Sequence, residues 1–301
     1  MNRTAALRHA ARRLGLRAAL QRTGGALGFD VVRRDFYSPV PDWRAEPPAR
    51  WSTPSAMPGV AFDLDAQRAT FEQDLAPRFP EFTPPVEPGA DPAEYHYANG
   101  FFGPLDADVL HAVIRWAAPG RVVELGSGHS TTVIAAAAAK NAADGSPLRH
   151  DVYDPFAREE LRTAIRASAD LHLVSAVDVP LARFEELEAG DVLFVDTTHT
   201  VKLGSDVNFV ILEVLPRLRP GVLVHIHDIF LPWEYPKAWF SDLEVYWAEQ
   251  YLLQAYLSGN DRYEVVLGNA ALAREHPDVV ARAVPQMAHA FNPGSMWLRA
   301  R

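Results

Sequence analysis

The fold of this chain is decided at Arg121-Val-Val-Glu-Leu-Gly-Ser-Gly-His-Ser130. The β-branched and aliphatic run at 122–125 is typical of a buried strand. Gly126 and Gly128 then form a turn, and the alanine-rich segment 130–140 predicts a helix. Glycine lets the backbone approach a ligand, and a helix start presents free N–H groups. This order of strand, glycine turn and helix is therefore typical of nucleotide-like cofactor sites in open α/β sheets.

The glycines alone are a weak motif, because an ordinary strand-to-helix turn can contain them. A dinucleotide fingerprint would have a third glycine at position 131, where this chain has Thr131. A phosphate loop would need Gly-Lys-Ser/Thr, which is absent from this turn. A nucleophile elbow has the pattern Gly-x-Ser-x-Gly, but the chain has Thr132 at the place of the last glycine after Ser130. The feature that remains is an acid, Glu124, two residues before the first glycine.

Composition limits the classes of function. The chain has 301 residues, 48% of them hydrophobic, a formal net charge of −9 and no cysteine. The negative charge argues against a general nucleic-acid binder, and the lack of cysteine excludes disulfides and thiolate chemistry. No apolar run approaches the roughly 20 residues of a transmembrane helix. We therefore expect a soluble, cytoplasmic protein.

Residues 1–93 predict an N-terminal extension, and residues 94–301 a catalytic domain. The extension begins with a basic segment, 1–22, that contains six arginines and no acid. That segment could be an amphipathic helix on a membrane surface or an acidic partner, but we favour a solvated or locally docked terminal helix. Proline-rich connectors at 36–60 and 80–93 flank a predicted helix over 65–79.

After the glycine turn, strands and helices alternate along the chain. Further strands are predicted over 151–154, 171–176, 191–196, 221–228, 263–267 and 295–299. Helices are predicted over 106–118, 158–169, 181–188, 204–218, 246–258 and 278–290. This alternation predicts an α/β fold: a Rossmann-like, seven-stranded, mostly parallel sheet with helices on both faces.

The second strand ends in Asp154, 26 residues after Gly128. This is close to the spacing at which an acid binds a ribose diol, and a carboxylate can accept hydrogen bonds from both hydroxyls. The alternative is that Asp154 caps a helix before Pro155, and both roles can hold together.

The reaction centre is predicted at Asp196-Thr-Thr-His199 and His225-Ile-His-Asp228, because the carboxyl ends of neighbouring strands converge. His225 and His227 point to one face of a strand and Asp228 to the other. His225 could equally be a core residue. We favour general-base catalysis by His199 or His227 without a metal. The alternative is a divalent metal such as Mg²⁺ bound by Asp196 and Asp228.

Two aromatic segments could contact a substrate. Tyr95 and Asn99 precede the first helix of the domain, where aromatic residues could also simply fill the core. Trp233, Glu234 and Tyr235 lie in a long loop after the fifth strand, which could form a substrate wall or pack its own aromatic rings. A wall of this kind would suit a sugar or an aromatic compound.

Several motifs beyond the glycine turn resemble one bacterial family of class I S-adenosylmethionine-dependent methyltransferase domains (methyltransferase-24-like). The resemblance spans about residues 95–268. The motifs are Asp191-Val-Leu-Phe-Val-Asp-Thr-Thr-His199, Lys202-Leu-Gly-Ser-Asp-Val-Asn208, Glu213-Val-Leu-Pro-Arg-Leu218, Gly221-Val-Leu-Val-His-Ile-His-Asp-Ile-Phe230, Pro232-Trp-Glu-Tyr-Pro236 and Glu249-Gln-Tyr-Leu-Leu253.

The resemblance implies a sheet whose last strand is antiparallel, and S-adenosylmethionine as cofactor. By position, it implies that Asp154 binds the ribose, that Asp178 lies near the adenine and that Asp196 faces the site of methyl transfer. It also implies that a set of residues around the glycine turn lines the methionine and ribose part: Glu124, Gly126, Ser127 and Gly128.

The sequence therefore predicts an enzyme that moves a methyl group to an oxygen or nitrogen of a small molecule, for example a sugar or an aromatic natural product. A homo-oligomer is compatible with this. An NAD-dependent oxidoreductase on a similar fold is disfavoured by the missing third glycine. A non-catalytic binding protein that kept the fold is the other alternative.

Overall fold

The computed structural model describes residues 15, 18–30, 32, 35–91, 94–289 and 292–301. The chain divides into two compact units, residues 1–46 and 47–301. In the first unit, most of the basic segment 1–22 lies outside the described residues, and a short 3₁₀ helix, η1 (Trp43–Ala45), ends the unit. The division into extension and catalytic domain at residue 93 stays a prediction.

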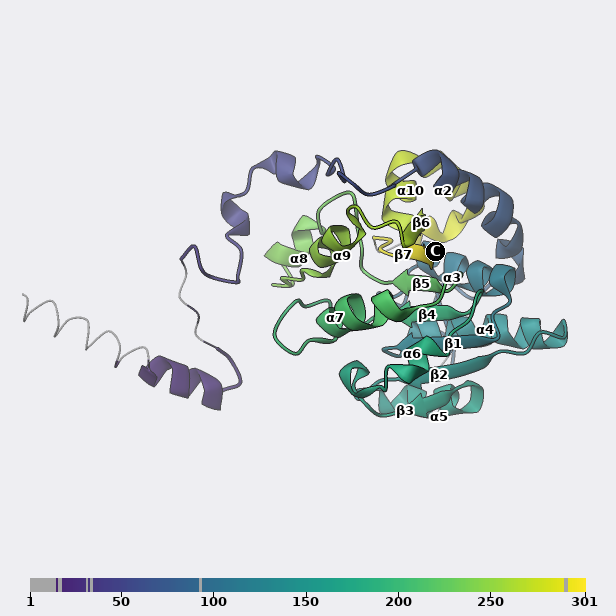
Figure 1. The fold of residues 1–301 in the computed structure, drawn as a ribbon, viewed down its shortest axis with the longest axis horizontal. Helices are drawn as coiled ribbons and strands as arrows, with labels where there is room; N and C mark the ends of the chain where they lie inside the picture. The colour runs from purple at the N-terminus through teal and green to yellow at the C-terminus, as the bar shows by residue number, and fades with distance from the viewer. Residues whose placement is uncertain (1–14, 16–17, 31, 33–34, 92–93, 290–291) are drawn as a thin grey trace, which may run out of the picture. The chain divides into compact units, whose positions relative to one another are not determined.

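Within the described part of the second unit, seven strands form one sheet in the order β3-β2-β1-β4-β5-β7-β6 (Figure 1). Only β7 runs antiparallel to its neighbours, so the predicted seven-stranded, mostly parallel sheet with an antiparallel last strand is confirmed. The strands are β1 (Arg121–Leu125), β2 (Arg149–Tyr153), β3 (Asp170–His172), β4 (Val192–Val195), β5 (Leu223–Ile226), β6 (Tyr263–Gly268) and β7 (Met296–Ala300).

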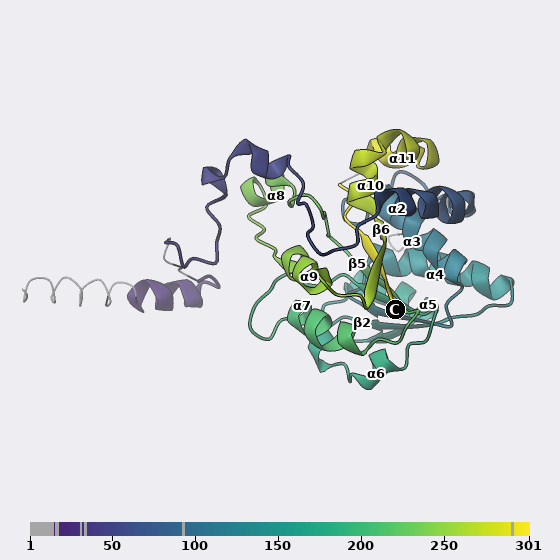
Figure 2. The same ribbon diagram turned by 45° about the horizontal axis from the view of Figure 1, so that its top comes forward.

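Helices cover both faces of this sheet, as predicted. Successive residues of β1 point to opposite faces: Val123 packs with α6 and α7, and Val122 packs with α3 and α4. Figure 2 shows α3 and α4 on one side of the sheet and α6 and α7 on the other. The α-helices are α2 (Leu64–Thr70), α3 (Pro104–Ala117), α4 (His129–Ala143), α5 (Glu159–Ser168), α6 (Ala182–Glu185), α7 (Asp206–Phe209), α8 (Lys237–Ser241), α9 (Glu249–Leu257), α10 (Asn269–Glu275) and α11 (Pro277–Ala283).

Several predicted elements are shorter or more irregular in the structure. The strand predicted over 171–176 ends at His172, and the helix predicted over 278–290 is broken before Pro285, which cannot continue an α-helix. Helix α10 was not predicted, because it follows β6 with no turn residue between them. The remaining short helices are η2 (Pro48–Trp51), η3 (Phe71–Leu75), η4 (Ala76–Glu81), η5 (Ala176–Asp178), η6 (Val210–Val214), η7 (Leu215–Arg217) and η8 (Pro285–His289).

The segment before α3 is attached to the sheet and to the loop after β5. Gln67 of α2 is buried, and its side-chain oxygen accepts a hydrogen bond from the backbone N–H of Gly268 at 2.9 Å. The backbone N–H of Ser55 donates to the carbonyl oxygen of Pro232 at 2.7 Å. Residues 47–82 therefore pack on the fold around β6 and the 230–235 loop.

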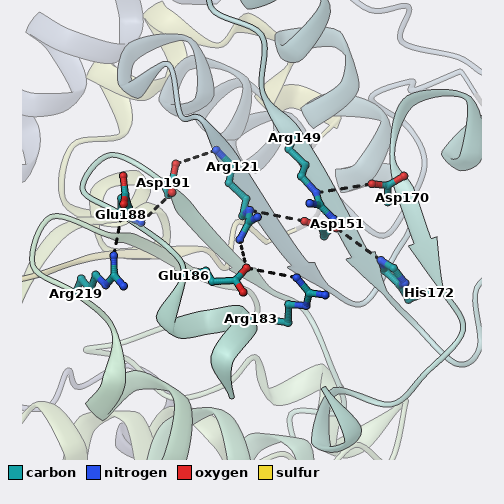
Figure 3. A network of polar contacts seen from close by, with 10 residues as sticks. All are labelled: Arg121, Arg149, Asp151, Asp170, His172, Arg183, Glu186, Glu188, Asp191 and Arg219. Carbon is teal, nitrogen blue, oxygen red and sulfur yellow. Dashed lines mark hydrogen bonds and ion pairs between the residues drawn. The ribbon is translucent and has the colours of Figure 1, made fainter. Parts of the chain in front are cut away.

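A network of ion pairs joins strands and loops away from the predicted reaction centre (Figure 3). Asp151 is nearly buried and lies between Arg121, Arg149 and His172. Asp191 accepts hydrogen bonds from the backbone N–H of Arg121 at 2.8 Å and of Glu188 at 2.9 Å. Since these charges satisfy one another, we assign the network a structural role.

In the described residues, no helix has both the length and the apolar character needed to cross a membrane.

Candidate active site

A cavity of about 360 Å³ lies at the carboxyl ends of β1, β2 and β4. We call it the glycine-turn cavity. Four residues predicted to bind cofactor line it: Gly126, Ser127, Asp154 and Asp196. The other lining residues were not singled out from the sequence, although Thr197, Thr198 and Asp206 lie within motifs quoted above. These other lining residues are Tyr153, Pro155, Phe156, Ser175, Ala176, Thr197, Thr198 and Asp206.

Gly126 is required where β1 meets β4. Its φ is +87°, and a Cβ atom at this position would lie 1.8 Å from the carbonyl oxygen of Asp196. No side chain fits this close approach, and the left-handed backbone favours glycine as well. The first predicted glycine thus lets two strand ends come together at the wall of the cavity.

Asp154 ties the end of β2 to the glycine turn. Its Oδ2 accepts hydrogen bonds from the Ser127 backbone N–H at 3.0 Å and from the Ser127 hydroxyl at 2.6 Å. Its Oδ1 accepts from the backbone N–H of Phe156 at 2.7 Å. The carboxylate therefore stabilises its own turn and still lines the cavity, which is compatible with both predicted roles.

Glu124 supports the turn from behind and is not among the residues that line the cavity. Its fully buried carboxylate accepts hydrogen bonds from Ser130 at 2.7 Å and from Thr131 at 3.1 Å, and contacts His150 at 2.8 Å. The Thr131 hydroxyl also accepts from the backbone N–H of Gly128 at 3.1 Å. Thr131, at the place of the missing third glycine, thus fixes the start of α4.

Gly128 and Asp178 are also absent from the residues that line the glycine-turn cavity. Asp178 is the last residue of η5, and the first residue of that helix, Ala176, does line the cavity together with Ser175. The structure therefore brings the predicted adenine region to the cavity, but through neighbours of the predicted acid.

His199 lies among three carboxylates. Its Nδ1 contacts Glu249 at 2.8 Å, and its Nε2 lies 3.2 Å from Asp196 and 3.6 Å from Asp228. Its ring also packs against Trp247 with a centroid distance of 4.3 Å. His199 and Asp228 both have a φ of +55°, an uncommon conformation that folded proteins retain where other contacts enforce it.

The carboxylates keep His199 protonated. Burial lowers the pKa of His199, but hydrogen bonds to Asp196 and Glu249 and the charge of Asp228 outweigh burial and raise it well above 6.5. At neutral pH the side chain is therefore an imidazolium, which has no lone pair to accept a proton. This does not favour the predicted role of His199 as general base.

The pKa of His227 is shifted in the same direction as that of His199, whereas the pKa of His225 is shifted in the opposite direction. Burial lowers the pKa of His227, but the charges of Asp228 and Asp196 outweigh it and the pKa is raised. Burial holds the pKa of His225 well below 6.5, and its ring stacks on Phe194 at 4.1 Å. His225 is thus the neutral core residue that the sequence left as an alternative.

The two acids differ strongly in their ionisation. Burial raises the pKa of Asp228 to about 6, although His227 and His199 act in the opposite direction. For Asp196, burial is outweighed by the nearby histidines, above all His227, and the pKa is lowered to about 2. Asp228 is therefore the carboxylate of this cluster that changes its charge closest to neutral pH.

The carboxylates of Asp196 and Asp228, the alternative metal ligands, both lie close to His199. Among the residues that the structure describes, no three His, Asp or Glu side chains are placed to hold a metal ion. Both carboxylates instead face the same nitrogen, Nε2 of His199. The donor set therefore fits a protonated imidazole between two acids better than a cation site.

Tyr95 and Asn99 contribute to structure and are not among the residues that line the glycine-turn cavity. The buried Tyr95 hydroxyl donates to the carbonyl oxygen of Phe102 at 2.8 Å. The Asn99 side chain accepts from the backbone N–H groups of Phe101 and Phe102 and so builds the turn before α3. These contacts fit the core-filling alternative.

The predicted substrate residues Trp233, Glu234 and Tyr235 line two further cavities. The proline cavity, about 470 Å³, is lined by Trp233 and Glu234 together with residues 47–55 and α9. The aromatic cavity, about 410 Å³, is lined by all three together with Trp51 and parts of α8 and α10. The loop therefore forms walls, although its rings also pack against one another.

Comparison with known proteins supports the class of fold. Residues 123–229 match a family model described as a methyltransferase domain. This match and the strand order above support a methyltransferase domain of the class I S-adenosylmethionine-dependent kind. No curated protein matches the chain.

Solved structures include similar folds. The apo-structure of CmcI has 17% sequence identity and a TM-score of 0.40, covering 64% of this chain and 78% of its own. CmcI with Mg and SAM has 17% identity and a TM-score of 0.39, covering 75% and 84%. An O-methyltransferase family protein from Burkholderia thailandensis has 17% identity and a TM-score of 0.36, covering 80% and 73%.

The glycine-turn cavity fits the cofactor of this class. Gly126 and Ser127 line it with the glycine turn, and the Asp154 carboxylate provides acceptors for hydroxyl groups.

The close approach at Gly126 predicts a large effect of Gly126→Ala. We expect it to lower the free energy of unfolding by at least twice as much as Gly145→Ala and to abolish S-adenosylmethionine binding. Gly145 has a similar φ of +88°, but no atom of the described residues lies within 4 Å of the point that its Cβ atom would occupy, so its substitution costs only the backbone strain, about 1–2 kcal/mol. Urea unfolding and calorimetric titration measure both effects. Equal losses for the two variants would contradict this assignment.

The contact between Glu249 and His199 predicts that Glu249→Gln lowers the pKa of His199, measured by NMR titration of the imidazole. Because the folded-state pKa is raised, the stabilisation is present below about pH 6.5 and is lost as pH rises through the folded value. The variant should therefore lose more stability at pH 6 than at alkaline pH. Glu72→Gln, which removes an exposed partner of Arg68, is the control. An unchanged His199 titration would refute the argument.

Proposed function

We propose that this enzyme transfers the methyl group of S-adenosylmethionine to an oxygen of a small-molecule acceptor. The observation that carries the proposal is the position of Asp196. Its side chain lines the glycine-turn cavity and contacts His199, so the cofactor cavity and the charged cluster share one residue. A nitrogen acceptor is the second form of the same proposal.

The cofactor would be held by Gly126, Ser127 and Asp154. Glu124 and Gly128 would fix the turn, and the predicted adenine region lies at Ser175 and Ala176. When bound, S-adenosylmethionine supplies a methyl group on a positively charged sulfur. The residues of this chain then have to place the acceptor, exclude water and take up a proton. Four side chains of the charged cluster are available for these tasks: Asp196, His199, His227 and Asp228.

We assign proton uptake to Asp228. A hydroxyl group that gains a methyl group must release its proton, and Asp228 is the buried acid whose pKa of about 6 leaves it ionised yet basic at neutral pH. The neighbouring aspartates favour the protonated forms of His199 and His227, and these would instead balance the charge of the two aspartates. This replaces the histidine base that the sequence suggested.

The acceptor is proposed to be a small molecule with a ring. Trp233 and Tyr235 present aromatic side chains at the aromatic cavity, and rings of this kind stack on planar or sugar-like groups. Glu234, the other predicted substrate residue of this loop, lies at the same wall.

The first test is calorimetric titration with S-adenosylmethionine, S-adenosylhomocysteine and NAD⁺, each with and without Mg²⁺. We expect both sulfur compounds to bind, NAD⁺ not to bind, and Mg²⁺ to leave the affinities unchanged. Binding of NAD⁺ alone would overturn the proposal in favour of an oxidoreductase. A signal that requires Mg²⁺ would restore the metal alternative at Asp196 and Asp228.

Proton uptake by Asp228 predicts that Asp228→Asn lowers kcat by about 10²–10⁴-fold and leaves the affinity for S-adenosylmethionine within a few-fold. In the unchanged protein, the rate should fall as pH drops through about 6, because the carboxylate must be ionised. Formation of S-adenosylhomocysteine with a panel of phenols and sugars measures this. Asp170→Asn, at an exposed acid of β3, is the control. A normal rate for Asp228→Asn would exclude this role.

A further inference from the structure

The aromatic cavity has walls that suit a planar ring. Its volume of about 410 Å³ lies within the range of cavities that bind small molecules. Four aromatic side chains line it: Trp51, Phe230, Trp233 and Tyr235. Three of these rings are nearly buried, so their positions are fixed by packing rather than by solvent. A flat ligand would therefore meet preformed faces on which to stack.

Two cationic side chains and one buried N–H group line the same cavity. Lys237 and Arg274 both line it, and neither forms an ion pair within the described part of the chain. The indole N–H of Trp51 is buried and finds no hydrogen-bond partner among the same residues. Since a buried donor is normally satisfied, the Trp51 N–H indicates an acceptor from outside the protein, and the exposed side chains of Lys237 and Arg274 add positive charge at the same cavity.

Glu234, an acid at the wall of this cavity, is already engaged. Its Oε1 accepts hydrogen bonds from the Tyr251 hydroxyl, from the Gln250 side chain at 3.3 Å and from the backbone N–H of Tyr235 at 3.1 Å. Arg274 instead lies over the ring of Trp233, 5.0 Å from its centroid. A guanidinium stacked in this way keeps its N–H groups at its edge, where they can bind a carboxylate in a bidentate manner.

Phe230 links the aromatic cavity to the proposed reaction centre. It lies two residues after Asp228 and lines the cavity. A Cβ atom on Gly294 would lie 2.9 Å from the Phe230 ring and 3.3 Å from Oδ1 of Asp228. The Phe230 ring and the Asp228 carboxylate therefore both lie close to Gly294, which brings the wall of the aromatic cavity near the residue that we assign to proton uptake.

We propose that the aromatic cavity binds a planar aromatic molecule with an anionic substituent, and that this molecule is the methyl acceptor. Trp51, Lys237 and Arg274 bind the anion, and the aromatic walls bind the ring. A carboxylate, a sulfate and a phosphate share the required chemistry. The role as acceptor rests on the proposed function, whereas the binding of an aromatic anion does not.

The test compares 2-naphthoate with its neutral analogue 2-naphthamide, by calorimetry or by NMR in the presence of the full chain. We expect the naphthoate to bind at least tenfold more tightly, and Arg274→Gln and Lys237→Gln each to weaken its binding about fivefold or more. Binding of the amide should stay unchanged in both variants. Arg50→Gln, in the proline cavity, and Lys140→Gln, at the end of α4, are matched controls that should not alter either affinity.

Equal binding of the acid and the amide would overturn the proposal, as would loss of binding in Arg50→Gln but not in Arg274→Gln. S-adenosylmethionine affinity is measured in the same variants and should not change. If naphthoate binds as expected but S-adenosylmethionine does not, the proposed function fails and the anion site stands. If the cofactor binds and naphthoate does not, the anion site fails alone.

Discussion

The close contact between the ends of β1 and β4 is the constraint on which the rest of this structure depends. The backbone N–H of Asp196 donates to the carbonyl oxygen of Leu125 at 2.9 Å. The carbonyl oxygen of Asp196 in turn lies so close to Gly126 that no side chain fits on this glycine. This contact fixes where the Asp196 side chain leaves the sheet. The cavity on one side of that side chain and the histidine on the other follow from the same geometry.

In the charged cluster of Asp196, His199, Asp228 and Glu249, the free-energy cost of burying charges is offset by the attraction between opposite charges. Transfer of isolated charges from water would cost several kcal/mol each, so charges in such a place have to compensate one another. Glu249 and His199 are tied twice, because the backbone N–H groups of Ala248 and Glu249 also donate to the His199 carbonyl oxygen. The beginning of α9 therefore carries one of the charges that hold His199 in its protonated form.

Much of the fold could be predicted from the sequence, and the reasons are local. The run 122–125 and the other apolar strands are short, β-branched and bounded by turn residues, which is a strong pattern. The role of Thr131 could not be predicted in the same way. Its hydroxyl donates a hydrogen bond to Glu124 and accepts one from the backbone N–H of Gly128, and no sequence motif describes this pair of contacts. Helix α10 was missed because a strand can pass directly into a helix.

The candidate site was predictable only where residues follow strand ends. Asp154, Asp196 and Asp228 were found in this way, whereas Glu249 lies 50 residues from His199 and reaches it only through the packing of α9. The charge state of His199 could not be predicted either, because it depends on how many acids surround the ring. The spacing of residues along the chain does not show how many acids lie close to the ring.

The hydrogen bonds of Gln250 have a consequence for engineering the range of acceptors. This buried side chain accepts from the backbone N–H of Phe230 and donates to the carbonyl oxygen of Trp233, so it holds the loop between the proline and aromatic cavities in one shape. Redesign should therefore leave the loop intact. The alanines of the aromatic cavity wall, Ala238, Ala270 and Ala273, have side chains of a single methyl group, and replacing them would resize the cavity without breaking these hydrogen bonds.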